Sequence, residues 1–278
     1  MNGLTLFRGR NASGLAWRLV PLLSVLAGAC SHAPVPGEEP APVEAPPVKV
    51  KSSAELIGAM HDRYADNWYR TLRFSQTNTF YTQSGGEQKS RWMEHLVVPG
   101  RLRIDFEPLS SKSGLLIVNN RVTTFDNGKR VDARHSIQAI LTLTADIYAI
   151  PARITQRRLD SLGIDLGKFR EDRFEKKRAY VMGGGKDDLE SNQVWIDADK
   201  LVLLRLIQRE KRGDRAIVTD THVGQYKDID GFSVAHEFVS MRDGKPYFRE
   251  VYQDVRVNTD IPASIFDPSK WVSSQPGG

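Results

Sequence analysis

Residues 101–106 read Arg-Leu-Arg-Ile-Asp-Phe, a stretch in which charged and apolar residues alternate strictly. Successive side chains of a β-strand point to opposite faces of the sheet, so Leu102, Ile104 and Phe106 share one face. Such alternation is typical of antiparallel sheets with one face on the core and one in water. The stretch therefore predicts a half-buried strand of an antiparallel sheet.

Similar patterns extend along the chain in both directions from this strand. A long strand begins at Thr71, a glycine turn follows at residues 84–87, and a return strand covers 91–98. A hairpin covers 115–125. Further strands, separated by turn residues, are predicted at 169–174, 178–182, 191–196, 201–210, 216–226, 232–241 and 247–257.

Helices are predicted at two places among these strands. A helix begins near Ser53, where Ser52 and Glu55 have the spacing of a capping box. Apolar residues at helical spacing predict a second helix before Pro151, and a short third one covers 155–162. The sequence thus predicts one α+β domain over residues 52–272, with about ten or eleven strands and helices inserted midway.

The first 51 residues are of a different kind. Three arginines precede a short apolar run at 19–29, which is the layout of a signal peptide over residues 1–29 and is too short for a stable transmembrane helix. Residues 26–30, Leu-Ala-Gly-Ala-Cys, resemble the bacterial lipobox, which implies lipid attachment at Cys30, with palmitate as a label for it. A plain signal peptide with an incidental cysteine, or a short uncleaved anchor, are the alternatives. We expect residues 30–51 to form a proline-rich tether and residues 273–278 to form a flexible tail.

The charge of the chain changes once the signal peptide is set aside. The whole chain has 39 Lys+Arg and 34 Asp+Glu; without the three signal arginines the balance is 36 against 34, or +2. A charge of +2 is too small to indicate a nucleic-acid partner, which the net charge of the whole chain had suggested. The single cysteine excludes an intramolecular disulfide and a multi-cysteine metal site.

No residue pattern in the chain supports catalysis. The histidines are not at metal-ligand spacing, the Gly183-Gly184-Gly185-Lys186 run lacks the rest of a phosphate loop, and the acidic pairs near Asp197 and Asp228 have the character of turn residues. We therefore predict that the chain is not an enzyme, has no catalytic residues, and uses no metal or cofactor.

Large apolar side chains recur on strand after strand. On a curved sheet they would line either a filled core or an apolar cavity, and a cavity would suit an acyl chain. The candidate lining residues are Phe74, Phe80, Trp92, Leu102, Ile104, Phe106, Ile117, Phe125 and Trp195.

The order of several short motifs resembles one known family. Residues 97–104 read Val-Val-Pro-Gly-Arg-Leu-Arg-Ile, 122–126 Val-Thr-Thr-Phe-Asp, 194–197 Val-Trp-Ile-Asp, and 257–268 Val-Asn-Thr-Asp-Ile-Pro-Ala-Ser-Ile-Phe-Asp-Pro. This series resembles the outer-membrane lipoprotein carrier and receptor superfamily (LolA/LolB-like) over about residues 53–271. The resemblance implies an unclosed antiparallel β-barrel with a helical lid over an apolar cavity. Val98 stands where the soluble carrier has an arginine, and Leu109 is the candidate for the apolar loop residue of the receptor.

The function expected from these observations is that of a membrane-anchored periplasmic lipoprotein. It would bind a lipid or an acylated lipoprotein in its cavity, in lipoprotein sorting or outer-membrane maintenance, with no nucleic-acid partner. Its expected location is the periplasmic face of the outer membrane, held by the N-terminal lipid. The alternative is a sensor or interaction module on the same fold, with a filled cavity and a protein partner.

Overall fold

The computed structural model describes residues 48–275 except residues 83 and 214. The predicted signal peptide, Cys30 and most of the tether lie outside these residues, as does the end of the tail. No helix in the described part of the chain is long and apolar enough to cross a membrane. The described residues belong to one compact unit, residues 45–278.

Thirteen strands form a single antiparallel sheet in the order β6-β5-β4-β3-β2-β1-β15-β14-β11-β10-β9-β8-β7. A separate two-stranded hairpin consists of β12 and β13. The strands are β1 (Thr71–Tyr81), β2 (Glu87–Val97), β3 (Arg101–Phe106), β4 (Gly114–Val118), β5 (Arg121–Asp126), β6 (Lys129–His135), β7 (Phe169–Phe174), β8 (Lys177–Met182), β9 (Gln193–Asp197), β10 (Leu203–Arg212), β11 (Arg215–Gly224), β12 (Lys227–Ile229), β13 (Phe232–Val234), β14 (Glu237–Arg242) and β15 (Lys245–Val257).

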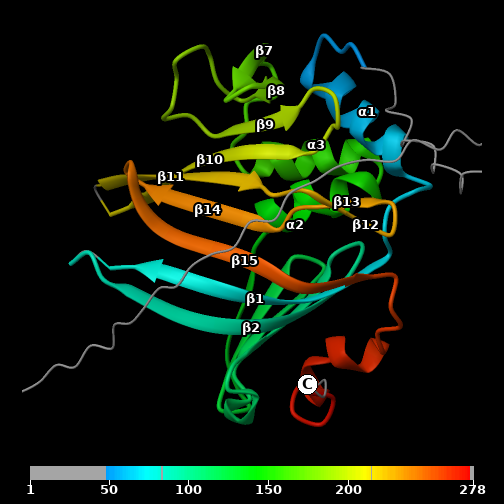
Figure 1. The fold of residues 1–278 in the computed structure, drawn as a ribbon, viewed down its shortest axis with the longest axis vertical. Coiled ribbons are helices and arrows are strands. Elements are labelled where there is room, and N and C mark those ends of the chain that lie inside the picture. The colour runs from blue at the N-terminus through cyan, green and yellow to red at the C-terminus, as the bar shows by residue number, and fades with distance from the viewer. Residues whose placement is uncertain (1–47, 83, 214, 276–278) are drawn as a thin grey trace, which may run out of the picture. The chain divides into compact units, whose positions relative to one another are not determined.

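The sheet is strongly curved but does not close, because its two edge strands, β6 and β7, do not pair with each other (Figure 1). The chain runs outward from β1 to β6, crosses through the helices to β7, and returns to β15 beside β1. The predicted fold class, an antiparallel unclosed barrel with helices inserted midway, is confirmed.

The helices pack on the inner, concave face of this sheet. They are α1 (Ser53–Tyr64), α2 (Ala139–Thr144), the 3-10 turn η2 (Asp146–Tyr148) and α3 (Ala152–Ser161). The Ser52 hydroxyl accepts the Glu55 N–H at the start of α1, as the capping box predicts. Leu56, Ile57 and Met60 of α1 are fully buried in the main core together with inner-face residues of the sheet.

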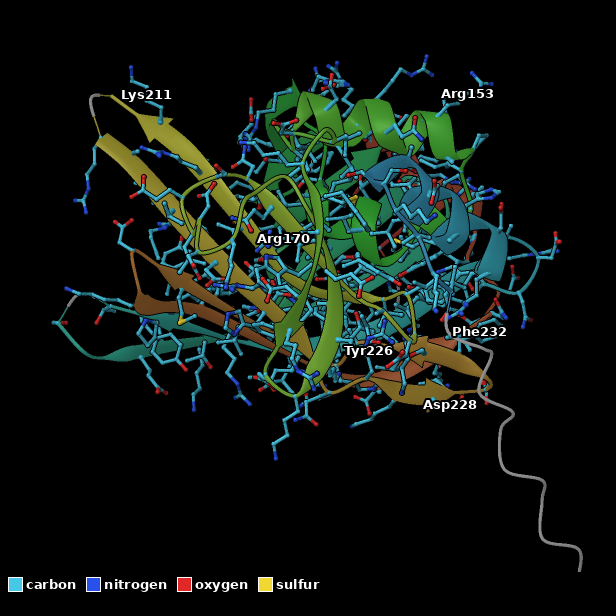
Figure 2. The ribbon with its side chains drawn as sticks, turned by 90° about the horizontal axis from the view of Figure 1, so that it is seen from above. Arg153, Arg170, Lys211, Tyr226, Asp228 and Phe232 are labelled. Atoms are coloured by element: carbon cyan, nitrogen blue, oxygen red, sulfur yellow. The ribbon has the colours of Figure 1, made fainter. Side chains whose placement is uncertain are left out.

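Two elements were not expected from the sequence. β6 has polar residues at nearly every position and is almost wholly exposed, so it lacks the apolar alternation that marks a strand. Charged residues suit it as an edge strand, since they oppose pairing with another chain. The β12–β13 hairpin divides the strand predicted at 232–241 into β13 and β14, and β13 pairs with β12 instead of continuing the main sheet. Asp228 of β12 and Phe232 of β13 are labelled at this hairpin in Figure 2.

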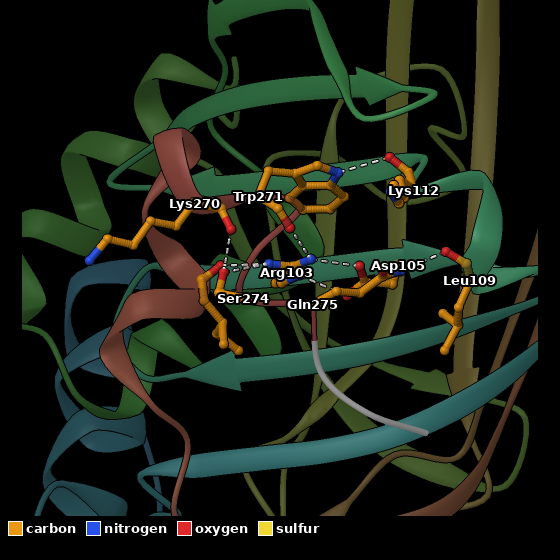
Figure 3. A network of polar contacts seen from close by, with 9 residues as sticks. Arg103, Asp105, Leu109, Lys112, Lys270, Trp271, Ser274 and Gln275 are labelled. Atoms are coloured by element: carbon orange, nitrogen blue, oxygen red, sulfur yellow. Dashed lines mark hydrogen bonds and ion pairs between the residues drawn. The ribbon is translucent and has the colours of Figure 1, made fainter.

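The outer face of β3 is covered by the C-terminal segment, which contains the 3-10 turns η3 (Ala263–Phe266) and η4 (Pro268–Lys270). Arg103 and Asp105 lie on this face, and their side chains are 0% and 1% exposed. The expectation of a half-buried strand is therefore wrong for these two residues. They form a bidentate ion pair, with the two N···O distances at 2.8 and 2.9 Å (Figure 3).

Candidate ligand-binding cavity

A cavity of about 280 Å³ lies on the inner face of the sheet, beneath the helices α2 and η2. Its walls come from β1–β4, from β11, β14 and β15, and from the helical segment that crosses between the two halves of the sheet. Residues 138–148 of that segment form the lid of the cavity. Because the two halves curve toward each other, side chains far apart in sequence face the same enclosed space.

The lining is mainly apolar and rich in aromatic rings. Phe74 stacks on Tyr252 with ring centroids 4.0 Å apart, and Phe238 contacts the same Tyr252 ring at 5.1 Å. Under the lid, Trp68 packs on Tyr148 at 4.1 Å. Large rigid rings define a stable wall for an apolar ligand.

The sequence-predicted lining residues divide into three groups in the structure. The first group lines the cavity and consists of Phe74, Trp92, Leu102, Ile104 and Ile117. Phe80 and Phe106 lie on the same inner face but beyond the cavity, half-buried beside Trp92, with Phe106 at 4.8 Å from its ring. They form an aromatic extension of the cavity wall.

Phe125 and Trp195 form the third group, and for them the predicted orientation is wrong. The inward-facing residues of β4, Leu115 and Ile117, pair with Thr124 and Val122 of β5. Phe125 pairs instead with Gly114 and therefore faces outward, where its ring stacks on that of Trp271 with centroids 4.3 Å apart. Trp195 lies between the inward-facing Val194 and Ile196, in a separate outer cluster. A one-residue change in register exchanges the faces of a strand, and the sequence does not fix that register.

Leu109 is half-buried in the 3-10 turn η1 (Leu109–Ser111). The Gln275 side chain donates a hydrogen bond of 2.7 Å to its carbonyl (Figure 3). It is thus not an exposed apolar loop tip as expected. Large exposed apolar side chains in the described residues are those of Val131, Leu189 and Val272.

Asp146 fastens the lid to the sheet. Its carboxylate accepts the Gly100 N–H at 2.8 Å, in the turn between β2 and β3, and pairs with Arg158 of α3 at 2.5 Å. Burial raises the pKa of Asp146, and the contacts with Arg158 and Gly100 oppose that rise. This link joins the lid to the turn that contains Val98, the residue that stands where the soluble carrier has an arginine. Here the charged residue of the link, Asp146, belongs to the lid and not to the turn.

Two carboxyl groups also line this apolar cavity, and the sequence analysis missed both. Glu94 of β2 and Glu250 of β15 lie on the inner face, and Glu94 is 5% exposed. Burial, and next the nearby Glu250, raises the pKa of Glu94 well above its usual range, and burial raises the pKa of Glu250 to about 7. Glu94 lies two residues from Trp92, so strand alternation alone could have placed both on one face.

Glu250 should make stability depend on pH. Its folded pKa of about 7 exceeds its ordinary 4.5, so the folded state binds the proton more tightly. The stabilisation of the folded state by the Glu250 proton is complete below about pH 4.5 and is lost as the pH rises through about 7. Relative to the wild type, Glu250→Gln should gain up to roughly 3 kcal/mol of unfolding free energy between about pH 4.5 and 8.

Urea denaturation of both proteins across this pH range checks the prediction. The difference between the proteins is the informative quantity, because the lowered pKa of His95, about 4, gives the wild type an opposing slope. Glu87→Gln, at an exposed position of β2, is the matched control. A Glu250→Gln difference that stays constant with pH would refute the assignment of a buried, neutral carboxyl.

The fold and the cavity together define an unclosed antiparallel barrel with a helical lid over an apolar cavity that is rich in aromatic rings. Solved structures share this fold. One is a LolA superfamily protein from Nitrosomonas europaea, with a TM-score of 0.51 and 11% identity, covering 78% of this chain and 98% of that one. An outer membrane lipoprotein-sorting protein domain from Vibrio parahaemolyticus gives a TM-score of 0.55 at 12% identity, over 78% and 97% of the two chains.

A DUF1329 family protein from Desulfovibrio piger has a TM-score of 0.54 at 13% identity, and covers 79% of this chain and 97% of that one. No protein-family model matches the sequence, and no curated protein matches it. The chain thus has a LolA-like fold. Among residues 48–275 as described, no three His, Cys, Asp or Glu side chains are placed to hold a metal ion.

Proposed function

We propose that this protein binds an acyl chain of a lipid or lipoprotein in the cavity beneath its lid. The observation that carries the proposal is the open space of about 280 Å³ between aromatic side chains of the sheet and the lid. Each methylene transferred from water to such a space contributes about 0.8 kcal/mol. The likeness of the fold to a lipoprotein-sorting domain supports the same class of ligand.

An open cavity favours this function over a sensor or interaction module whose cavity is filled. Asp146 links the lid to the turn between β2 and β3, and the apolar side chains of Leu143 and Ile147 anchor the lid in the main core above this open space.

The binding activity is tested with 1-N-phenylnaphthylamine, an uncharged dye that fluoresces in apolar surroundings. The dye should bind saturably, and uncharged long-chain lipids should displace it. A fluorescence signal no greater than that of a carrier protein without a cavity, at the same concentration, would argue against the proposed function.

The second part of the proposal concerns location, namely that the protein is attached to the periplasmic face of the outer membrane through a lipid on Cys30. The lipobox-like residues 26–30 and the proline-rich tether support it. Cys30→Ala should abolish labelling by palmitate and release the protein from the membrane fraction. Ser31→Ala is the matched control, and labelling that persists in Cys30→Ala would contradict the anchor.

A further inference from the structure

We propose that the cavity selects its ligand by the polar end: Glu94 and Glu250 hold an ammonium group, and the same residues disfavour a negatively charged end. This inference rests on the proposed function, since it presumes that an amphiphile enters the cavity. It adds the chemical class of that amphiphile, a long-chain cationic amine.

The first observation is the position of the two carboxyl groups. On β1, Phe74 pairs with Glu94 of β2 on one side, and Asn78 pairs with Glu250 of β15 on the other. Both glutamates line the cavity, and the charge of Glu250 is close enough to contribute to the raised pKa of Glu94, after the larger effect of burial. Neither has a hydrogen bond or an ion pair within the described part of the chain.

The second observation concerns the amides between them. Gln76 and Asn78 are 1% and 0% exposed, and the Gln76 Nε2 donates to Asn78 Oδ1 at 2.8 Å. The Gln76 Oε1 and the Asn78 Nδ2 have no partner among the described residues. Exchanging O and N in both amides leaves the same result, one acceptor and one donor unused. Buried polar groups normally have hydrogen-bond partners, so these two amides, which are buried on β1 beside the cavity but do not line it, have unused bonding capacity.

The hydroxyl groups of the cavity differ from these residues, because several have partners. Tyr148 donates to the Leu201 carbonyl at 3.1 Å, and Tyr226 donates to the Leu203 carbonyl at 2.7 Å. Thr221 and Ser240 bond each other at 2.8 Å. Unused polar capacity therefore lies at the two glutamates and the buried amides of β1, and also at the Trp68 Nε1, a cavity-lining donor without a partner among the described residues.

The third observation is the sign of the charge. The lining contains two carboxyl groups and no lysine, arginine or histidine. An anionic end would enter without a counter-charge and beside two acidic groups, which is unfavourable at low dielectric. An ammonium group would favour the ionised form of a nearby carboxyl group and pair with the resulting carboxylate, and the faces of Trp92, Phe74 and Tyr252 would also attract a cation.

The experiment compares three ligands with the same alkyl chain and different ends: dodecylammonium, dodecan-1-ol and dodecanoate. Each displaces phenylnaphthylamine from the purified full chain at about pH 7.5, below its micelle concentration. Dodecylammonium should bind at least about ten-fold more tightly than dodecanoate, with dodecanol between them. In the double variant Glu94→Gln/Glu250→Gln this preference should fall to about two-fold or less, because ammonium binding weakens and dodecanoate binding strengthens.

Glu87→Gln is the control, since it removes one carboxyl from an exposed position of the same strand β2. It should keep the wild-type preference. The two single variants serve if the double variant fails to fold, and each should reduce the preference. Equal affinities of the wild type for all three ligands, or tightest binding of dodecanol or dodecanoate, would overturn the inference while leaving acyl-chain binding intact. If neither the three ligands nor the dye bind to the protein, the proposed function itself is refuted.

Discussion

Replacing Arg103 with methionine should lower the free energy of unfolding by about 3–5 kcal/mol, the largest loss expected for a single substitution in this domain. The guanidinium is the partner of Asp105, and both side chains are buried. It also donates to the carbonyls of Ile265 and Trp271, at 3.1 and 2.9 Å, and lies 3.9 Å from the centre of the Trp271 ring (Figure 3). Removing it leaves a buried carboxylate without a partner and frees the C-terminal segment.

Urea denaturation measures this loss, and Arg121→Met on the exposed side of β5 is the control, with an expected change within about 0.5 kcal/mol. The double variant Arg103→Met/Asp105→Leu should recover part of the loss, because no unpaired charge remains. A loss for Arg103→Met equal to that of Arg121→Met would mean that the C-terminal segment is not held through this ion pair.

Replacing Ala235 with tryptophan should weaken ligand binding by at least about ten-fold while the protein stays folded. Ala235 lies between β13 and β14, lines the cavity and is 6% exposed. A tryptophan there occupies the space that we assign to the acyl chain. In a densely packed core such an enlargement costs about 1–3 kcal/mol, so a smaller loss of stability would itself indicate open space.

Binding of phenylnaphthylamine and urea denaturation are measured on the same preparations. Ala54→Trp, at an exposed position of α1, is the matched control and should change neither quantity. If Ala235→Trp binds the dye as tightly as the control does, the dye is held at another place and the cavity is not the ligand site.

The sequence predicts the architecture well because strand alternation is a local property. Residues 101–106 alternate, and the structure places Leu102 and Ile104 inward on β3 as expected. The pattern says nothing of what covers the other face, however. Arg103 and Asp105 are charged and alternate with apolar residues, yet they are buried because a segment more than 150 residues later in the chain packs over them.

The site was only partly predictable for a related reason. Alternation finds the large apolar residues but not the register, so Phe125 and Trp195 fall on the outer face. The glutamates were missed because a charged residue on a strand suggests a solvated position. Only the three-dimensional pairing of β1 with β2 and β15 brings Glu94 and Glu250 to one wall.

The most direct test of the central claim is native mass spectrometry of the protein after expression in the periplasm and gentle purification without detergent. If the cavity holds an amphiphile, a fraction of the protein should carry a discrete added mass, and that mass should disappear in Ala235→Trp. A spectrum with only the ligand-free mass, from a protein that also fails to bind phenylnaphthylamine, would contradict the binding of an amphiphile in the cavity.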